Sequence, residues 1–321
     1  MIFTSLPDNY APLSEGLVYR AELEQVRDTV DVEIINVGTG RTEGVCRFTG
    51  VDKIEIDIAH YVNRMFNPQP VDKPTGIYSA DDRVAKVCIA IDGVRSPQRI
   101  FSLFACDGVP RMVSGLTYQR SIALGERDEI PLYAPKGGDV VIYIWQGSRM
   151  TDSHTFAIAP SQEVRVLAIN TGEFDSGTTS VEVFFFGNLH DDYLTYRITE
   201  RPQQRNRLSW LTSFGSIESY TFPARREVKL TASRERFYGS GGSLTRNVSE
   251  ERSVTLTSDP EPSDMVAALE EIISSRAVWS VGGGRTVPVD VVSSECRYDA
   301  DGSPAIISVE VRTSKRGEEK L

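Results

Sequence analysis

Histidine is scarce in this sequence of 321 residues, which has only three, at positions 60, 154 and 190. Imidazole titrates near neutral pH and is the commonest metal ligand, so its scarcity argues against histidine-rich metal sites and histidine-dependent acid–base catalysis. Cysteine is almost as scarce, and no two of the four cysteines have metal-ligand spacing. Cys46, Cys88 and Cys106 lie in apolar runs, so we interpret them as buried thiols, whereas Cys296 lies apart from them. Cys88 and Cys106 could face each other across neighbouring strands, which leaves a disulfide between them open.

Long apolar runs and a secretion signal are also missing. No stretch approaches the ~18 uninterrupted apolar residues that indicate a membrane-spanning helix. The first ten residues contain no Lys or Arg and no apolar run of signal-peptide length. We therefore expect no membrane partner, and a cytoplasmic location until the protein is assembled into a larger particle. The net charge of −10 predicts repulsion from nucleic acid unless a local basic patch compensates, so nucleic acid is not an expected partner.

The sequence does contain many stretches in which apolar residues occupy every second position, the pattern of half-buried strands. Val51–Ile58 alternates in this way, and two glycine-containing turns suggest hairpins around residues 31–48 and 84–106. Val140–Trp145 is apolar throughout and predicts a strand covered on both faces. Further strands are expected at Glu163–Asn170, Thr179–Phe186, Tyr193–Thr199, Thr286–Tyr298 and Ala305–Thr313. Turn residues separate them at intervals typical of β-sandwiches, so we predict a mainly β protein.

Two segments break this alternation and predict helices. Asp264–Ser275 places Met265, Leu269 and Ile272 on one face, and Ser263 is a suitable N-cap. Ala59–Phe66 is a shorter candidate, for which Asp57 is the expected cap.

Polar, Gly- and Pro-containing stretches near residues 110–130 and 200–207 suggest two domain boundaries. We predict a β-sandwich domain with a short helix at residues 1–115 and a second β-sandwich domain at residues 116–203. Residues 204–321 form a third, β-rich α+β domain that carries the helix at 264–275.

No motif in the sequence carries a catalytic mechanism. The glycine-rich loops match neither the dinucleotide-binding nor the P-loop spacing, and no serine lies in a nucleophile elbow. His190-Asp191-Asp192 could bind a cation, and Asp299–Gly302 resembles the start of a calcium loop, but both favour turns between strands. We therefore predict no catalytic, cofactor-binding or metal-binding residues and expect a protein that is not an enzyme. A dispersed carboxylate pair or triad stays open as an alternative, because sequence does not show spatial proximity.

Aromatic residues are the remaining candidates for function. Trp145, Trp210 and Trp279 could build a platform for stacking sugars, although core packing is the favoured interpretation. Phe184, Phe185 and Phe186 are consecutive, and neighbouring residues of a strand point to opposite faces, so this strand places phenyl groups on both sides. A strand covered on both faces suggests contact with another layer, domain or subunit, and we therefore expect oligomerisation.

Three patches of sequence resemble virion-structural proteins of phages and prophages of gut-type bacteria. Arg207–Phe222 has a Trp-Leu pair, a glycine, an acidic residue and an aromatic-Thr-Phe strand, and Leu269–Trp279 and Val51–Phe66 are similar to further segments of such proteins. The resemblance adds Trp210, Tyr220 and Phe222 to the candidate interaction residues. It implies a tail or baseplate component, one copy in a ring, with other tail proteins as partners. A carbohydrate-binding β-sandwich module is the alternative.

Overall fold

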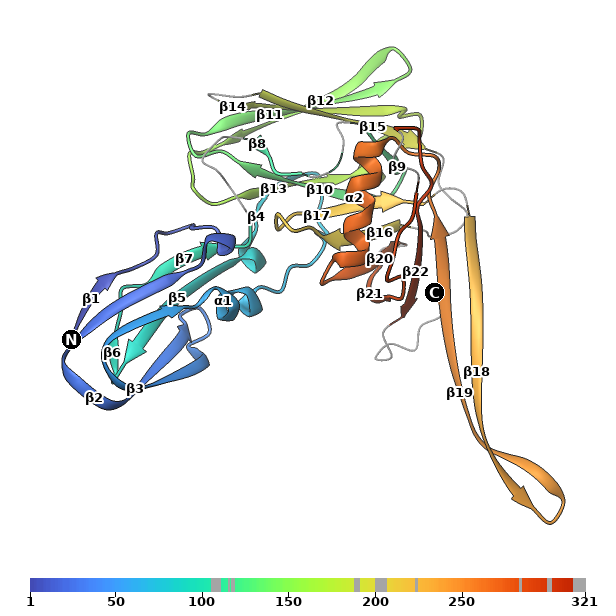
Figure 1. The fold of residues 1–321 in the computed structure, drawn as a ribbon. Helices are drawn as coiled ribbons and strands as arrows, with labels where there is room; N and C mark the ends of the chain where they lie inside the picture. Colours follow the sequence, from blue (N-terminus) through green and yellow to red (C-terminus); the bar gives the residue numbers. More distant parts are fainter. Residues whose placement is uncertain are drawn as a thin grey trace.

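The computed structural model describes residues 1–104, 111–114, 116, 119–187, 191–199, 207–222, 225–282, 285–298 and 302–313. Strands dominate these residues, and they form four sheets in the described part of the chain. The prediction of a mainly β fold is therefore confirmed. Figure 1 shows the sheets grouped into three units, which we call the first, middle and third units.

The first unit is a sheet in which the long strands β2 and β3 form a hairpin, with β2 in the centre of the sheet, β3 at its edge and α1 packed against it. The first half of β2 pairs with β1 and its second half pairs with β5. Val62 and Phe66 place α1 and its end in the same core as Tyr19 and Ile58. The elements are β1 (Ile2–Ser5), η1 (Leu13–Glu15), β2 (Val18–Asn36), β3 (Arg41–Asp57), α1 (Ala59–Met65), η2 (Asp81–Arg83), β5 (Val84–Ile91), β6 (Val94–Arg95) and β7 (Arg99–Ser102).

The middle unit is a sandwich of two sheets. One sheet has the order β4 (Gly76–Ser79), β13 (Arg165–Asn170), β10 (Arg127–Tyr133), β8 (Arg111–Met112), with η3 (Thr171–Glu173) after β13. The other has the order β12 (Arg149–Ile158), β11 (Gly138–Gln146), β14 (Ser180–Gly187), β15 (Asp191–Thr199), β9 (Gln119–Ala123). Its core lies between them, because Ile130 and Leu167 of one sheet pack with Ile142 and Val183 of the other.

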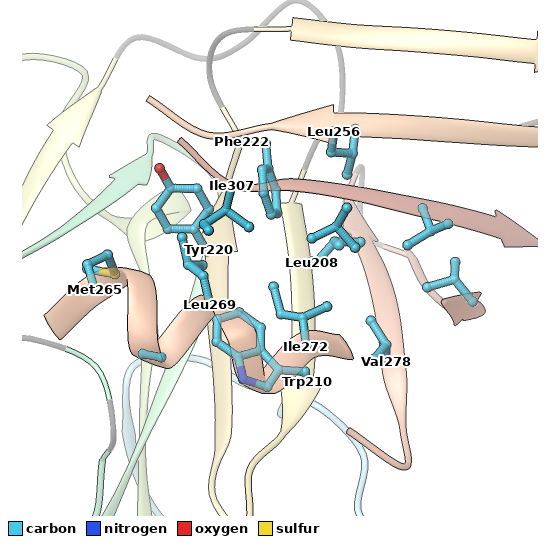
Figure 2. Close-up of a cluster of buried hydrophobic side chains, with 14 of the residues drawn as sticks. Leu208, Trp210, Tyr220, Phe222, Leu256, Met265, Leu269, Ile272, Val278 and Ile307 are labelled. Atoms are coloured by element: carbon cyan, nitrogen blue, oxygen red, sulfur yellow. The ribbon is translucent and has the colours of Figure 1, made fainter. Parts of the chain in front are cut away.

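The third unit is an antiparallel sheet covered on one face by α2 (Ser263–Ser274). Figure 2 shows Leu269 and Ile272 of this helix packed near Trp210 and Val278 of the sheet. The strand order is β17 (Ile217–Thr221), β16 (Arg207–Leu211), β20 (Val278–Gly282), β21 (Arg285–Val291), β22 (Ser308–Thr313), β19 (Gly242–Thr257), β18 (Arg225–Gly239).

Both predicted helices are present, and their N-termini are capped differently from each other. Asp57 Oδ1 accepts hydrogen bonds from the N–H groups of Ala59 and Leu17, so this carboxylate serves the start of α1 as expected, although Ile58 occupies the N-cap position. The prediction for Ser263 is wrong, since Ser263 is the first helical residue and Pro262 is the N-cap. Asp264 accepts a hydrogen bond from the N–H of Met265 in that first turn.

The predicted domain boundary at residue 115 does not separate the first unit from the middle unit. β4 and β8 both lie within the 1–115 segment, yet both are strands of the middle unit. After β4 the chain returns to the first unit through β5, since β5 pairs with β2. The other predicted boundary lies near residues 200–207, of which residues 200–206 are outside the described residues and Arg207 begins β16.

Buried charges join the middle unit to the third unit. Arg120 of β9 and Asp128 of β10 meet Arg207 of β16 and Glu218 of β17, and all four side chains are at most 4% exposed. Arg120 lies 3.3 Å from Asp128 and 3.2 Å from Glu218, and Arg207 lies 3.2 Å from Asp128. Tyr196 donates a further hydrogen bond of 2.8 Å to Asp128. Because the two positive and two negative charges balance, this cluster can stay ionised without contact with water.

The first unit is held against the other two by separate contacts. Arg83, 1% exposed, pairs with the buried Glu129 of β10 at 2.5 Å, and Glu129 also accepts a hydrogen bond from the N–H of Val71. Gly215 of the turn between β16 and β17 approaches the backbone of Leu103, where an added Cβ would lie 2.4 Å from the carbonyl oxygen. Glycine is required there for a second reason, because its φ is +85°. The units are therefore connected by specific buried contacts.

We predict that Arg207→Met lowers the free energy of unfolding by about 3–5 kcal/mol, because it leaves Asp128 buried with less compensating charge. Arg20→Met is the matched control, since Arg20 and Glu55 form an exposed pair at 2.8 Å and exposed pairs contribute little to stability. Urea unfolding followed by tryptophan fluorescence and far-UV circular dichroism measures both. Equal losses for the two variants would contradict the role assigned to the cluster.

A second prediction concerns pH. Tyr220 donates a hydrogen bond of 2.6 Å to Glu261, whose pKa is raised above its usual value by burial and by the nearby Asp259 and Asp264. The native carboxyl group therefore keeps its proton at pH values where the unfolded one has lost it, so ionisation disfavours the native state as pH rises. Glu261→Gln should gain stability relative to the parent as the pH is raised from about 4, where the unfolded carboxyl group begins to ionise, towards neutral pH. Parallel unfolding curves across this range test it, and a pH-independent difference would refute it.

Candidate interaction surfaces

The most exposed part of the described chain is a long hairpin formed by β18 and β19. Among the described strands, β22 pairs with β19 only at Ser253–Thr257 and β18 pairs only with β19, so residues 227–252 pair with each other and with no other described strand. Every residue from 227 to 252 is exposed. We call this segment the arm, and Figure 1 shows it extending away from the body of the molecule.

The two faces of the arm differ in polarity. Residues paired directly opposite each other in an antiparallel ladder share a face. One face carries Val228, Leu230 and Ala232 of β18 with Val248 of β19, and among these Leu230 is 55% exposed. We call it the apolar face of the arm; its other members are Arg234, Glu250 and Arg252. The opposite face has only polar residues up to the irregularity at Glu235, namely Glu227, Lys229, Thr231, Ser233, Glu235, Asn247, Ser249 and Glu251.

The apolar face of the arm continues the buried face of the third unit. Val254 lies opposite Val228, and both Val254 and the next residue on that side, Leu256, are buried in the core beneath α2. Beyond them the same face runs out of the body and is exposed. At the tip, Phe237 and Leu244 lie opposite each other, and Tyr238 is 90% exposed. The arm therefore has the alternation of apolar residues that is typical of a sheet with one buried face, although its residues are exposed.

A second exposed apolar surface lies on the outer face of the middle unit. Tyr143 and Trp145 of β11, Phe184 and Phe186 of β14, and Tyr193 of β15 all point away from the sandwich core. Phe186 is 43% exposed and Tyr193 is 54% exposed. We call these five residues the aromatic patch. A β11 strand covered on both faces was expected, but only its inner residues are buried.

The rings of the aromatic patch contact one another. The Phe184 ring lies 5.8 Å from Tyr143, 6.1 Å from Phe186 and 6.4 Å from Tyr193, measured between ring centroids. Trp145 donates a hydrogen bond of 3.0 Å to Glu182 on the same face. The patch is therefore a continuous surface over three neighbouring strands.

Four of the six predicted interaction residues lie in hydrophobic cores. Phe185, Trp210 and Phe222 are fully buried and Tyr220 is 7% exposed, so in the folded chain they do not form a surface for a partner. Phe185 faces inward because it is in register with Val140 on the core side of β11, and the other three pack beneath α2. Phe184 and Phe186, in contrast, face outward, as expected for alternate residues of a strand.

The other predicted positions are only partly within the described residues. His190 and Asp299–Asp301 lie outside the described residues, whereas Asp192 accepts a hydrogen bond from the N–H of Met112 within the middle unit. No group of three or more His, Cys, Asp or Glu side chains among the described residues is arranged to hold a metal ion. Cys46, Cys88 and Cys296 are free thiols, and Cys106 lies outside the described residues.

A cavity of about 490 Å³ lies between the first and third units. Its polar lining pairs internally, since Arg276 donates a hydrogen bond of 2.6 Å to the Asn63 side chain and Ser213 donates to Glu271. Burial lowers the pKa of Arg276. We interpret the cavity as part of the contact between the units.

The described helices all fall short of the length and apolar character that crossing a bilayer requires.

Comparisons with known proteins yield no relative. No family model matches the chain, and no curated protein is significantly similar to it. Among solved structures, the extracellular domains 3–5 of Drosophila OTK are 9% identical, with 79% of this chain and 91% of that one covered at a TM-score of 0.26. The titin Ig tandem domains A164-A165 are 10% identical, with 62% of this chain and 97% of that one covered at a TM-score of 0.26. The S-layer protein rSbsC is 9% identical, with 83% of this chain and 41% of that one covered at a TM-score of 0.22. Scores this low establish neither a shared family nor a shared function.

Proposed function

We propose that this chain is a non-enzymatic structural protein of a phage or prophage tail or baseplate, and that it acts by docking onto other proteins. The observation that carries the proposal is the arm, whose residues 227–252 are all exposed. The sequence resemblance of Arg207–Phe222 to virion-structural proteins supports the choice of a tail assembly.

The arm is poorly suited to remain free in solution. An isolated two-stranded hairpin is at best marginally stable in water, and unpaired strand edges are templates for pairing with another chain. An alternation of apolar and polar residues is typical of a sheet with one buried face. The apolar face of the arm and its open edges together favour a protein partner that covers them.

The body to which the arm is attached favours a structural role as well. Buried charge pairs connect the middle unit with both the first and the third units. Units joined in this way hold the arm and the other surfaces of the molecule in fixed relative positions, which a building block of a particle requires.

A carbohydrate-binding function is the alternative, and the aromatic patch is the observation that favours it. Exposed rings such as Phe186 and Tyr193 can stack on sugars. This alternative predicts binding on a glycan array that Phe186→Ala and Tyr193→Ala abolish, whereas shortening the arm leaves it unchanged. The assembly proposal predicts no such glycan signal.

We predict that shortening the arm prevents assembly without unfolding the body. The variant lacks residues 230–237 and 244–252, so that Lys229 leads directly into the existing turn at residues 238–243 and Ser253 follows that turn. It should retain the parent's melting behaviour and solubility, because the excised side chains are exposed. Particles released from producing cells, sedimented and probed with an antibody to this chain, should contain the parent and lack the variant.

A point-variant pair separates the arm's two faces. Leu230→Gln with Val248→Gln alters the apolar face, and Thr231→Gln with Ser249→Gln alters the polar face next to it without changing the charge. Only the first pair should reduce incorporation, by about tenfold or more. Absence of the parent chain from all sedimenting particles, or full incorporation of the shortened variant, would refute the proposed function.

A further inference from the structure

The described chain has two exposed apolar surfaces that cannot cover each other within one molecule. The apolar face of the arm lies on β18 and β19, and the aromatic patch lies on β11, β14 and β15. Figure 1 shows the arm extending away from the sheet that carries the patch. Each surface therefore needs a partner outside its own copy.

We propose that the two surfaces are partners of each other in different copies, so that the apolar face of one copy's arm lies on the aromatic patch of the next. This inference rests on the proposed assembly function and specifies its partner as a second copy of this chain.

The two surfaces are complementary in charge. The strands of the arm and its base, residues 225–257, carry seven Arg or Lys and four Glu, whereas the whole chain has 35 basic and 45 acidic residues. Around the aromatic patch the balance is reversed, because Asp139, Glu182 and Asp191 share its face with Arg197. An interface between a basic ribbon and an acidic face is attractive, and it disfavours pairing of two patches or two arms.

The surfaces are also complementary in residue type. Leu230, Val228 and Val248 offer aliphatic side chains to the rings, and Arg234 and Arg252 lie on the same face of the arm. Arginine binds carboxylates through paired hydrogen bonds and stacks on aromatic faces, so it suits a patch that presents both groups.

The lengths of the surfaces agree. The apolar face runs over seven residues of β18, from Val228 to Arg234, and the face with the patch runs over seven residues of β11, from Asp139 to Trp145. At about 3.3 Å per residue both extend roughly 20 Å. The arm can therefore lie along the patch without leaving a long uncovered remainder on either side.

Because arm and patch are different surfaces, the contact is head-to-tail. A row of copies then has one unused arm at one end and one unused patch at the other, so the row closes into a ring or continues as a filament. A symmetric dimer would instead use the same surface of both copies. This difference makes the inference testable by mixing variants.

The test uses the full chain and measures mass by light scattering over a range of concentrations. An arm variant (Leu230→Gln with Val248→Gln) and a patch variant (Phe184→Gln with Phe186→Gln) each lose one surface and keep the other. We expect the parent to form multimers and each variant alone to self-associate at least about tenfold more weakly. Mixed in equal amounts, the variants should form a species of two chains, because one intact arm meets one intact patch. Thr231→Gln with Ser249→Gln is the control and should behave as the parent.

Each other outcome overturns the inference. If the parent stays monomeric at every concentration, or if the patch variant assembles like the parent, the patch is not the receptor for the arm. If both variants are monomeric and their mixture stays monomeric, the contact is not head-to-tail between copies. In all of these cases the proposed assembly function is judged separately, by whether the arm is needed for incorporation into particles. Unchanged thermal unfolding of both variants shows that lost association is not lost folding.

Discussion

The arrangement of the units depends on charges that are buried where the units meet. Arg120 and Asp128 of the middle unit pair with Glu218 and Arg207 of the third unit, so separating the two units would break both of these buried ion pairs. Apolar contacts tolerate sliding, whereas charges in a region without water accept only the geometry that pairs them. The cluster therefore contributes specificity of orientation, and with it a defined direction for the arm and a defined position for the aromatic patch.

The sequence was most informative where a pattern is local. The helix at 264–275 and the hairpin strands around residues 31–48 follow from the spacing of apolar residues, and the structure contains both. Strand geometry places Phe185 on the opposite face from Phe184 and Phe186. The sequence also offers a signal for which face is inner, because Val181 and Val183 share the face of Phe185 whereas Glu182 shares the face of Phe184, and the register of Phe185 with Val140 agrees with it.

Features that depend on long-range pairing were missed. Arg207 and Asp128 are far apart in sequence, and each resembles an ordinary surface charge until the fold brings them together. The arm was missed for a different reason, since its strands contain enough charged residues to look like a polar linker. The alternation Val228, Leu230, Ala232 ahead of the glycine-rich turn was the available signal. Burial of Trp210 likewise depends on α2, which follows it in the chain by more than fifty residues.

The path of the chain through β4 affects how the protein can be made and divided. Residues 76–79 complete a sheet whose other strands follow much later, while the segments before and after them belong to the first unit. During synthesis, β4 must wait for β13 to emerge, since β13 is its strand partner. No single cut of the backbone separates the first unit from the middle one with both sheets intact. A gene fragment ending between them would leave one fragment with an orphan strand and the other with an open sheet edge, a combination that favours aggregation. Both sheets are therefore complete only when the first and middle units are present in one continuous chain.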